Sequence, residues 1–132
     1  MAEADQTSRY WIAAGAANGL MAVVMGAFAA HGLRGSALPQ GLGWVKTASD
    51  YQMWHGLALL ALAALARGRW TLLSRLAAIA FLVGIILFSG GLYLLALSGW
   101  TAFAWITPLG GISLLIGWAL LLAFALAPQP GP

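Results

Sequence analysis

The composition of this 132-residue chain excludes a soluble globular domain, because 62% of the residues are hydrophobic, only 7% are charged and the mean hydropathy is +0.90. The formal net charge of +3 comes from six basic residues, which are too few and too scattered for a nucleic-acid-binding surface. The chain has no cysteine, which excludes disulfides, thiolate nucleophiles and cysteine-ligated iron–sulfur or zinc sites.

The first apolar run covers residues 10–31 and follows a polar segment, residues 1–8, that we expect to be a short mobile tail. A helix needs roughly 20 apolar residues to cross the hydrocarbon core of a bilayer, so this run predicts a membrane-spanning helix. Arg9 and the sequence Ala27-Phe28-Ala29 also fit a signal peptide. The run is longer than the apolar part of such a peptide, about 7–15 residues, and we therefore expect an uncleaved helix.

Small residues recur along this first run at spacings of three and four, which places them on one side of a helix. They are Gly15, Gly19, Ala22, Gly26 and Ala30. In lipid no hydrophobic force drives helices together, and close backbone approach at small residues supplies much of the packing energy. We therefore expect this stripe to contact another helix. Asn18 lies at its edge near mid-membrane, and we expect it to be a buried polar residue that hydrogen-bonds between helices.

Three further apolar runs predict spanning helices over residues 46–66, 72–97 and 107–127, followed by a short tail at 128–132. Residues 40–50 are half apolar and are interpreted as a helical lead-in lying in the membrane interface. Gly84 and Gly117 belong to small-residue faces on the third and fourth spans.

Thr107 and Pro108 predict the beginning of the fourth helix, as its N-cap and its first helical residue. The alternative is a longer fourth helix with a kink between Trp105 and Leu109.

The predicted fold class is all-α: a polytopic membrane protein with a single domain, residues 1–132, in which four helices form a transmembrane bundle. Four basic residues share one side of the membrane with both termini, and two lie on the other. The first set is Arg9, Arg67, Arg69 and Arg75; the second is Arg34 and Lys46. By the positive-inside rule, this distribution places both termini in the cytoplasm.

Two histidines are expected at the same end of the bundle, since His31 ends the first span and His55 lies near the beginning of the second. We expect His31, Tyr51 and His55 to form one polar cluster that satisfies loop carbonyls. A two-histidine metal or haem site is the alternative, but two ligands underfill most metal sites, so we expect no metal and no cofactor. Lys46 and Asp50 are four residues apart, a spacing that permits an ion pair.

The sequence contains no glycine-rich phosphate loop, nucleophile–base pair or carboxylate pair, and we do not expect an enzyme. Two functions remain. One is a non-catalytic packing, accessory or assembly subunit in the lipid bilayer, in contact with a larger membrane complex or with a second copy. The other is a small-molecule, ion or haem/metal binder that uses the histidines. No nucleic-acid partner is expected.

Four motifs occur in order over nearly the whole chain. They are Gly26-Ala27-Phe28-Ala29-Ala30-His31-Gly32-Leu33; Tyr51-Gln52-Met53-Trp54-His55; Phe88-Ser89-Gly90-Gly91-Leu92-Tyr93-Leu94-Leu95-Ala96-Leu97-Ser98-Gly99; and Ile106-Thr107-Pro108-Leu109-Gly110-Gly111 with Gly117-Trp118. In these motifs the chain closely resembles domain-of-unknown-function family 423. The family consists of small bacterial inner-membrane proteins, so the resemblance implies an inner-membrane location and supplies no catalytic residues. Members more often carry Gly at the position of Ala29 and Ala at that of Gly56.

Overall fold

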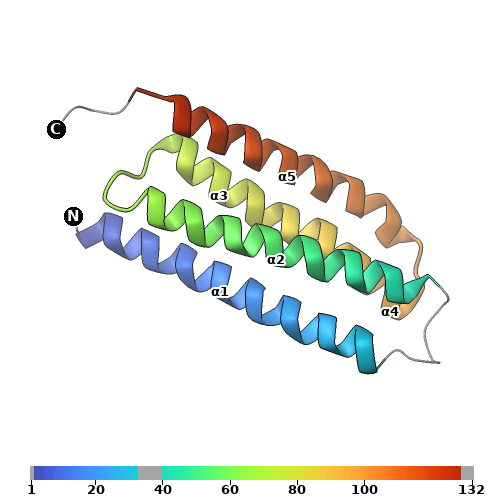
Figure 1. Ribbon diagram of the computed structural model, residues 1–132. Helices are drawn as coiled ribbons and strands as arrows, with labels where there is room; N and C mark the ends of the chain where they lie inside the picture. The colour runs from blue at the N-terminus through green and yellow to red at the C-terminus, as the bar shows by residue number, and fades with distance from the viewer. Residues whose placement is uncertain (1, 33–39, 129–132) are drawn as a thin grey trace.

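The computed structural model describes residues 2–32 and 40–128, with side chains from residue 6 onward, and its regular secondary structure is entirely helical over these residues. The elements are α1 (Ala2–His31), α2 (Gly41–Leu65), α3 (Leu72–Ile85), the π-helical turn η1 (Ile86–Gly90), α4 (Gly91–Ser98) and α5 (Ala102–Leu126). Because α3, η1 and α4 follow one another without a break, they make one long helix, and the fold is an all-α membrane bundle of four long helices (Figure 1).

The four helices pack mainly in chain order. α1 packs on α2, α2 packs on α3 and α4, and these pack on α5. α1 and α5 therefore lie at opposite edges of the bundle (Figure 1). Among the described side chains of α1, only Ser8, Gly15, Ala22 and Ala29 are buried. They are spaced seven residues apart, so α1 contacts its neighbours through a single narrow stripe.

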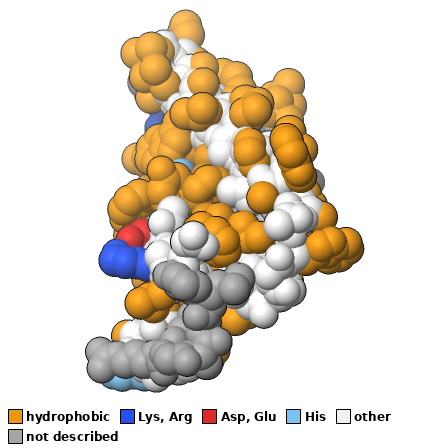
Figure 2. Space-filling model, turned by 90° about the vertical axis from the view of Figure 1, so that its right-hand side faces the viewer, with side chains coloured by type: hydrophobic (Ala, Val, Ile, Leu, Met, Phe, Trp, Pro, Cys, Tyr) orange, Lys and Arg blue, Asp and Glu red, His pale blue; other side chains and the backbone are white. Residues whose placement is uncertain are grey.

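Three helical segments are long and apolar enough to cross a membrane: Gln6–His31, Leu72–Ser98 and Ala102–Leu126. α2 has a comparable length but carries Lys46, Asp50, Gln52 and His55, and it is enclosed between α1 and α3–α4. Large apolar side chains cover much of the outer surface (Figure 2). This distribution suits a lipid environment, in which polar groups must find partners inside the protein.

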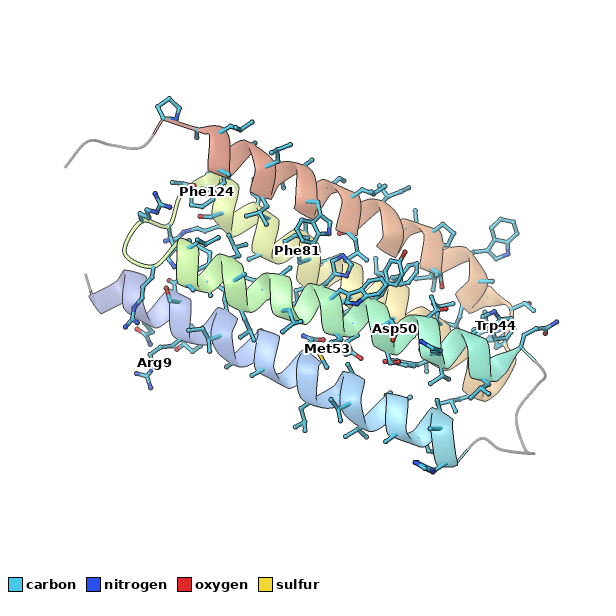
Figure 3. All side chains as sticks on the ribbon, viewed as in Figure 1. Arg9, Trp44, Asp50, Met53, Phe81 and Phe124 are labelled. Carbon is cyan, nitrogen blue, oxygen red and sulfur yellow. The ribbon has the colours of Figure 1, made fainter. Side chains whose placement is uncertain are left out.

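α1 and α2 approach most closely at Gly15 and Gly56. A Cβ atom at Gly15 would lie 2.8 Å from the carbonyl oxygen of Gly56, and one at Gly56 would lie 3.2 Å from that of Gly15. Gly19 and Gly26 face the same interface with room for a methyl group: their nearest atoms would be Met53 Sδ at 3.9 Å and Ser49 Oγ at 3.8 Å. Figure 3 shows Met53 between α1 and α2.

The predicted small-residue stripe is therefore only partly correct. Ala30 is exposed and the stripe continues through Ala29, because the buried residues recur every seven positions. At Gly15 a side chain would overlap the facing helix, whereas Gly19 and Gly26 leave room for one more carbon.

The second close contact joins α3 and η1 to α5. A Cβ at Gly117 would lie 2.6 Å from Cδ1 of Phe81, and one at Gly84 would lie 3.0 Å from the backbone nitrogen of Leu114. A Cβ at Gly110 would overlap the backbone of Phe88, with its Cα at 2.8 Å. Glycine at positions 84 and 110 lets the backbones meet, and glycine at 117 leaves room for the ring of Phe81. Gly84 and Gly117 were predicted on small-residue faces, and both lie at this contact.

Two predicted segment assignments are wrong at the beginnings of α1 and α2. α1 begins at Ala2, so the expected tail is the first part of the helix, and the indole Nε1 of Trp70 donates to Ser8 Oγ at 2.9 Å. α2 begins at Gly41, so the expected interfacial lead-in is its first turns, in which Val45 and Ala48 are fully buried. Packing against neighbouring helices extends both helices beyond their apolar runs.

The beginning of the last helix also differs from the preferred prediction. α5 begins at Ala102 and Pro108 lies inside it, so Thr107 is not the N-cap, and the alternative of a longer helix is correct in its extent. Pro108 cannot donate a backbone hydrogen bond. The hydroxyl Oγ1 of the neighbouring Thr107 donates to the carbonyl of Phe103 at 3.0 Å.

The glycine contacts predict that Gly15→Ala and Gly26→Ala have different effects. Gly15→Ala should lower the free energy of unfolding by about 1–3 kcal/mol, because the added carbon overlaps Gly56 and Leu60. Gly26→Ala should leave it unchanged or raise it slightly, since its nearest neighbour lies at 3.8 Å and alanine favours helix. Unfolding of the detergent-solubilised protein, followed by circular dichroism, measures both. Equal losses would contradict the assignment of Gly15 as the close contact.

Candidate functional site

Gln52 lies near the middle of α2 and links three helices. Its side chain is buried, its Nε2 donates to Asn18 Oδ1 on α1 at 3.0 Å, and its Oε1 accepts from the Tyr93 hydroxyl on α4 at 2.8 Å. Asn18 Nδ2 in turn donates to the carbonyl of Ala14 at 2.9 Å. These three side chains, which we call the Gln52 network, satisfy one another inside the bundle. Asn18 thus bonds between helices from a half-buried position.

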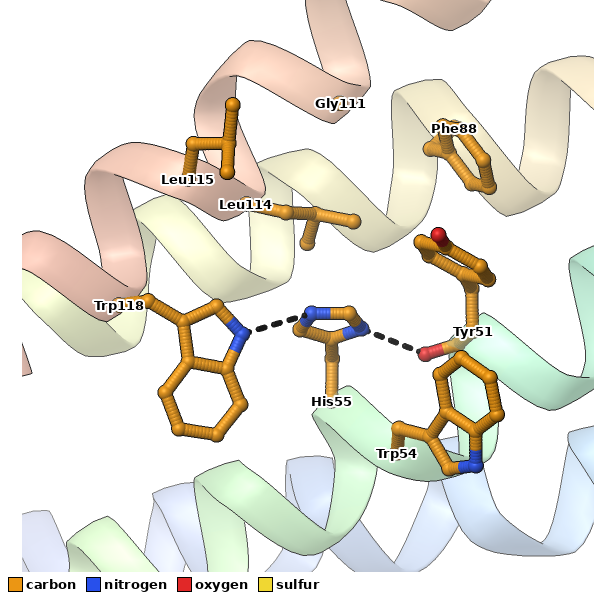
Figure 4. Close-up of a pocket in the computed structure, with 8 residues that line it drawn as sticks. All are labelled: Tyr51, Trp54, His55, Phe88, Gly111, Leu114, Leu115 and Trp118. Atoms are coloured by element: carbon orange, nitrogen blue, oxygen red, sulfur yellow. Dashed lines mark hydrogen bonds between the residues drawn. The ribbon is translucent and has the colours of Figure 1, made fainter.

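His55 lies one turn further along α2 and is also buried. Its Nδ1 is 2.7 Å from the carbonyl oxygen of Tyr51. A carbonyl can only accept, so Nδ1 carries the proton and Nε2 keeps a lone pair. That lone pair accepts a hydrogen bond from the indole Nε1 of Trp118 on α5, at 3.1 Å (Figure 4). Both ring nitrogens are therefore engaged in a neutral imidazole, and the ring ties α2 to α5.

Aromatic rings surround His55. The rings of Phe81 and Trp118 meet edge to face with centroids 5.2 Å apart, and His55 lies 5.7 Å from Phe81. On the other side of His55, the ring of Tyr51 stacks on Phe88 at 4.6 Å. These contacts fix the orientation of the rings that line the gap between α2 and α5.

A cavity of about 440 Å³ lies between α2, η1 and α5, and we call it the α2–α5 cavity (Figure 4). It is lined by Tyr51, Trp54, His55, Phe88, Gly111, Leu114, Leu115 and Trp118. None of these residues carries a permanent charge. Trp54, Leu115 and Trp118 are each about half exposed or more, so the cavity opens sideways on the apolar outer surface.

The π-helical turn Ile86–Gly90 supplies Phe88 to this cavity. Such turns occur mostly as single interruptions of α-helices and are frequent at functional sites. Ser89, in the same turn, is buried, and its hydroxyl has no hydrogen-bond partner among the residues that the structure describes. The turn therefore contributes one aromatic side chain, Phe88, to the cavity lining.

The predicted cluster of His31, Tyr51 and His55 is formed only in part. The rings of Tyr51 and His55 stack with centroids 5.8 Å apart, and His55 bonds the Tyr51 carbonyl, but His31 does not join them. His31 is exposed in the last turn of α1. Gly19 lies at the level of Gly56, the neighbour of His55, because its backbone nitrogen would be 3.4 Å from a Cβ at Gly56. His31 lies twelve residues beyond Gly19. At 1.5 Å per residue, His31 is displaced from the level of His55 by about 18 Å along the helix. The prediction failed for His31 because α2 begins at Gly41, which places His55 about four turns inside the helix.

The other predicted polar pair lies at the end of the bundle that contains His31. Lys46 Nζ is 2.7 Å from Asp50 Oδ2, and the two side chains are 72% and 42% exposed. An exposed pair at this spacing contributes a few tenths of a kcal/mol.

No group of three or more His, Cys, Asp or Glu side chains that could hold a metal ion occurs among the described residues. At His55, a metal would have to displace the hydrogen bond from Trp118.

Three residues that form these contacts were missed by the sequence analysis: Gln52, Tyr93 and Trp118. A signal for two of them was present in the sequence. Gln52 is a polar amide within a helix otherwise rich in Leu and Ala, and Trp118 lies in the middle of an apolar run, far from the interfacial position typical of tryptophan. Their partners could not be assigned without the register of the helices.

Comparison with known proteins finds relatives that match most of the chain. A family model described as "Protein of unknown function (DUF423)" matches residues 25–111. The UPF0382 inner membrane protein YgdD of Escherichia coli strain K12 is 40% identical over 120 residues, which cover 91% of this chain and 92% of the relative.

Two further relatives come from other bacteria. A UPF0382 membrane protein of Haemophilus influenzae is 46% identical over 103 residues, 78% of this chain and 82% of the relative. The UPF0382 membrane protein SAB0533 of Staphylococcus aureus is 41% identical over 114 residues, 86% and 93% of the two chains. No solved structure matches the chain significantly.

Proposed function

This chain belongs to the DUF423 family of membrane proteins of unknown function, and we propose that it is a non-catalytic accessory or assembly subunit of the bacterial inner membrane. The polar side chains in its centre support a structural role. The Gln52 network and His55 are bonded within the chain, and they hold α1, α4 and α5 against α2.

The outer face of α1 is the observation that carries this proposal. Exposed residues recur there at spacings of four and three, and we call them the α1 outer stripe: Ala16, Leu20, Val23, Ala27 and Ala30. Three of the five are alanine, and small residues let helix backbones approach closely in lipid. Leu20 and Val23 add exposed apolar surface. In this chain the stripe has no helix against it among the described residues, so we propose that a helix of another membrane protein, or of a second copy, packs there.

The distribution of basic residues between the two ends of the bundle supports one orientation of the chain in the membrane. α1 begins and α5 ends at the same end of the bundle as the connection between α2 and α3 (Figure 1). Four arginines, at positions 9, 67, 69 and 75, belong to this end, whereas Lys46 belongs to the other; Arg34 lies outside the described residues. We propose a multi-pass topology with both termini in the cytoplasm.

The alternative function, a ligand site built on two histidines, loses its geometric support because His31 and His55 are far apart. Of the two histidines, only His55 lines the α2–α5 cavity.

Cross-linking from the α1 outer stripe tests the accessory role. A photoreactive benzoylphenylalanine at Ala16 or Ala27, introduced in the full chain in its own host, should give an adduct of discrete mass on illumination. Matched positions on α5, Leu122 and Leu126, are also exposed apolar sites and should give none. No adduct from α1, or the same adducts from both helices, would contradict a partner at the stripe.

Single-cysteine labelling tests the orientation, because the chain contains no cysteine of its own. Thr101→Cys, in the exposed turn before α5, should react with a membrane-impermeant maleimide in intact spheroplasts. Gln6→Cys, exposed in the first turns of α1, should react only after lysis. The reverse pattern would overturn the proposed orientation.

A further inference from the structure

We propose that the α2–α5 cavity binds the ring of a lipid-soluble quinone: a flat, uncharged ring with carbonyl oxygens, carried on an apolar tail. Such binding needs no partner protein and is separate from the accessory role. Four features of the cavity support it: its shape, its polarity, the free hydroxyl of Tyr51 and its position in the bundle.

The shape favours a flat ring. In Figure 4 the rings of Tyr51 and Trp118 lie on opposite sides of His55, and the space between α2 and α5 lies among them. Each ring is fixed by a neighbour, Tyr51 by stacking on Phe88 and Trp118 by its edge-to-face contact with Phe81. Aromatic faces and edges held in this way favour offset stacking with another ring. The volume, about 440 Å³, lies within the range of small-molecule pockets.

The lining favours an uncharged ligand that carries a hydrogen-bond acceptor. No lining residue has a permanent charge. The two nitrogens of His55 are already bonded, Nδ1 to the carbonyl of Tyr51 and Nε2 to the indole Nε1 of Trp118. The hydroxyl of Tyr51 has no hydrogen-bond partner among the described residues, and in Figure 4 its oxygen points away from α2 toward the cavity. A phenolic hydroxyl donates readily to a carbonyl oxygen. A ligand carbonyl would therefore satisfy a donor that the site leaves free.

The position of the cavity along the helices indicates that its ligand comes from the hydrocarbon core of the membrane. His55, Phe88 and Trp118 each lie near the middle of their long helix, so the cavity is far from both membrane surfaces. Its mouth lies beside Trp54 and Leu115, which are 55% and 70% exposed. Phospholipid headgroups stay at the interface, and acyl chains carry neither a ring nor an acceptor. A quinone dissolved in the hydrocarbon core brings both to this depth, and its tail can leave through the mouth.

Binding by the purified full chain in detergent micelles tests the proposal. The probe is a benzoquinone bearing one isoprene unit, titrated by isothermal calorimetry. One saturable site per chain is expected. Tyr51→Phe should weaken binding about two- to tenfold, because it removes only the hydroxyl. Tyr10→Phe, on an exposed tyrosine of α1, is the matched control and should bind as the unaltered chain does.

A second pair of variants tests the cavity without touching a buried residue. Leu115→Trp should abolish binding by filling the mouth, while Leu122→Trp, two turns further along the same side of α5, should not. Both leucines are exposed, so both variants should keep the helical circular dichroism of the parent.

Three results would overturn the proposal: no saturable binding of the quinone, equal binding by Leu115→Trp, or equal competition by a straight-chain alcohol of the same carbon number. The last result would identify the cavity as an ordinary lipid contact. Because this experiment uses the isolated chain, its failure leaves the cross-linking test of α1 unaffected.

Discussion

The rest of the bundle depends on one constraint, which is met at Gln52: a buried polar side chain must find its hydrogen-bond partners within the protein. A polar side chain in the hydrocarbon core has no water to bind, so its partners must come from other helices. Gln52 takes one partner from α1 and one from α4, and His55 takes one from α5. The most polar helix, α2, therefore lies between α1 on one side and α3 and α4 on the other.

The same arrangement explains the cavity. α1 meets α2 with glycine against glycine at Gly15 and Gly56, and α5 meets η1 closely at Gly110. Between α2 and α5 there is no such backbone contact, and the two helices are connected by the side chains of His55 and Trp118. Long side chains keep these backbones apart and leave an aromatic space that opens toward lipid. The bundle is thus closely packed at its two glycine contacts and open at its histidine contact.

Apolar runs and glycine spacing predicted the all-α membrane bundle, because membrane thickness fixes the length of a spanning helix and small residues favour close approach. The candidate site was predicted less well. Asn18 and His55 were recognised as buried polar residues, but their partners depend on the register between helices, which local spacing does not determine. His55 was placed too close to His31 because hydropathy puts the beginning of the second span at residue 46, whereas α2 begins at Gly41.

A double-mutant cycle between Gln52 and Tyr93 tests most directly whether buried hydrogen bonds to α2 hold the bundle together. Gln52→Leu, Tyr93→Phe and the double variant would be unfolded in detergent, and the coupling free energy obtained from the four stabilities. The bond between Tyr93 and Gln52 Oε1 predicts a coupling of about 0.6 kcal/mol, with roughly 1.7 kcal/mol as the upper range for such bonds in membranes. Additive effects, with no coupling, would contradict the account.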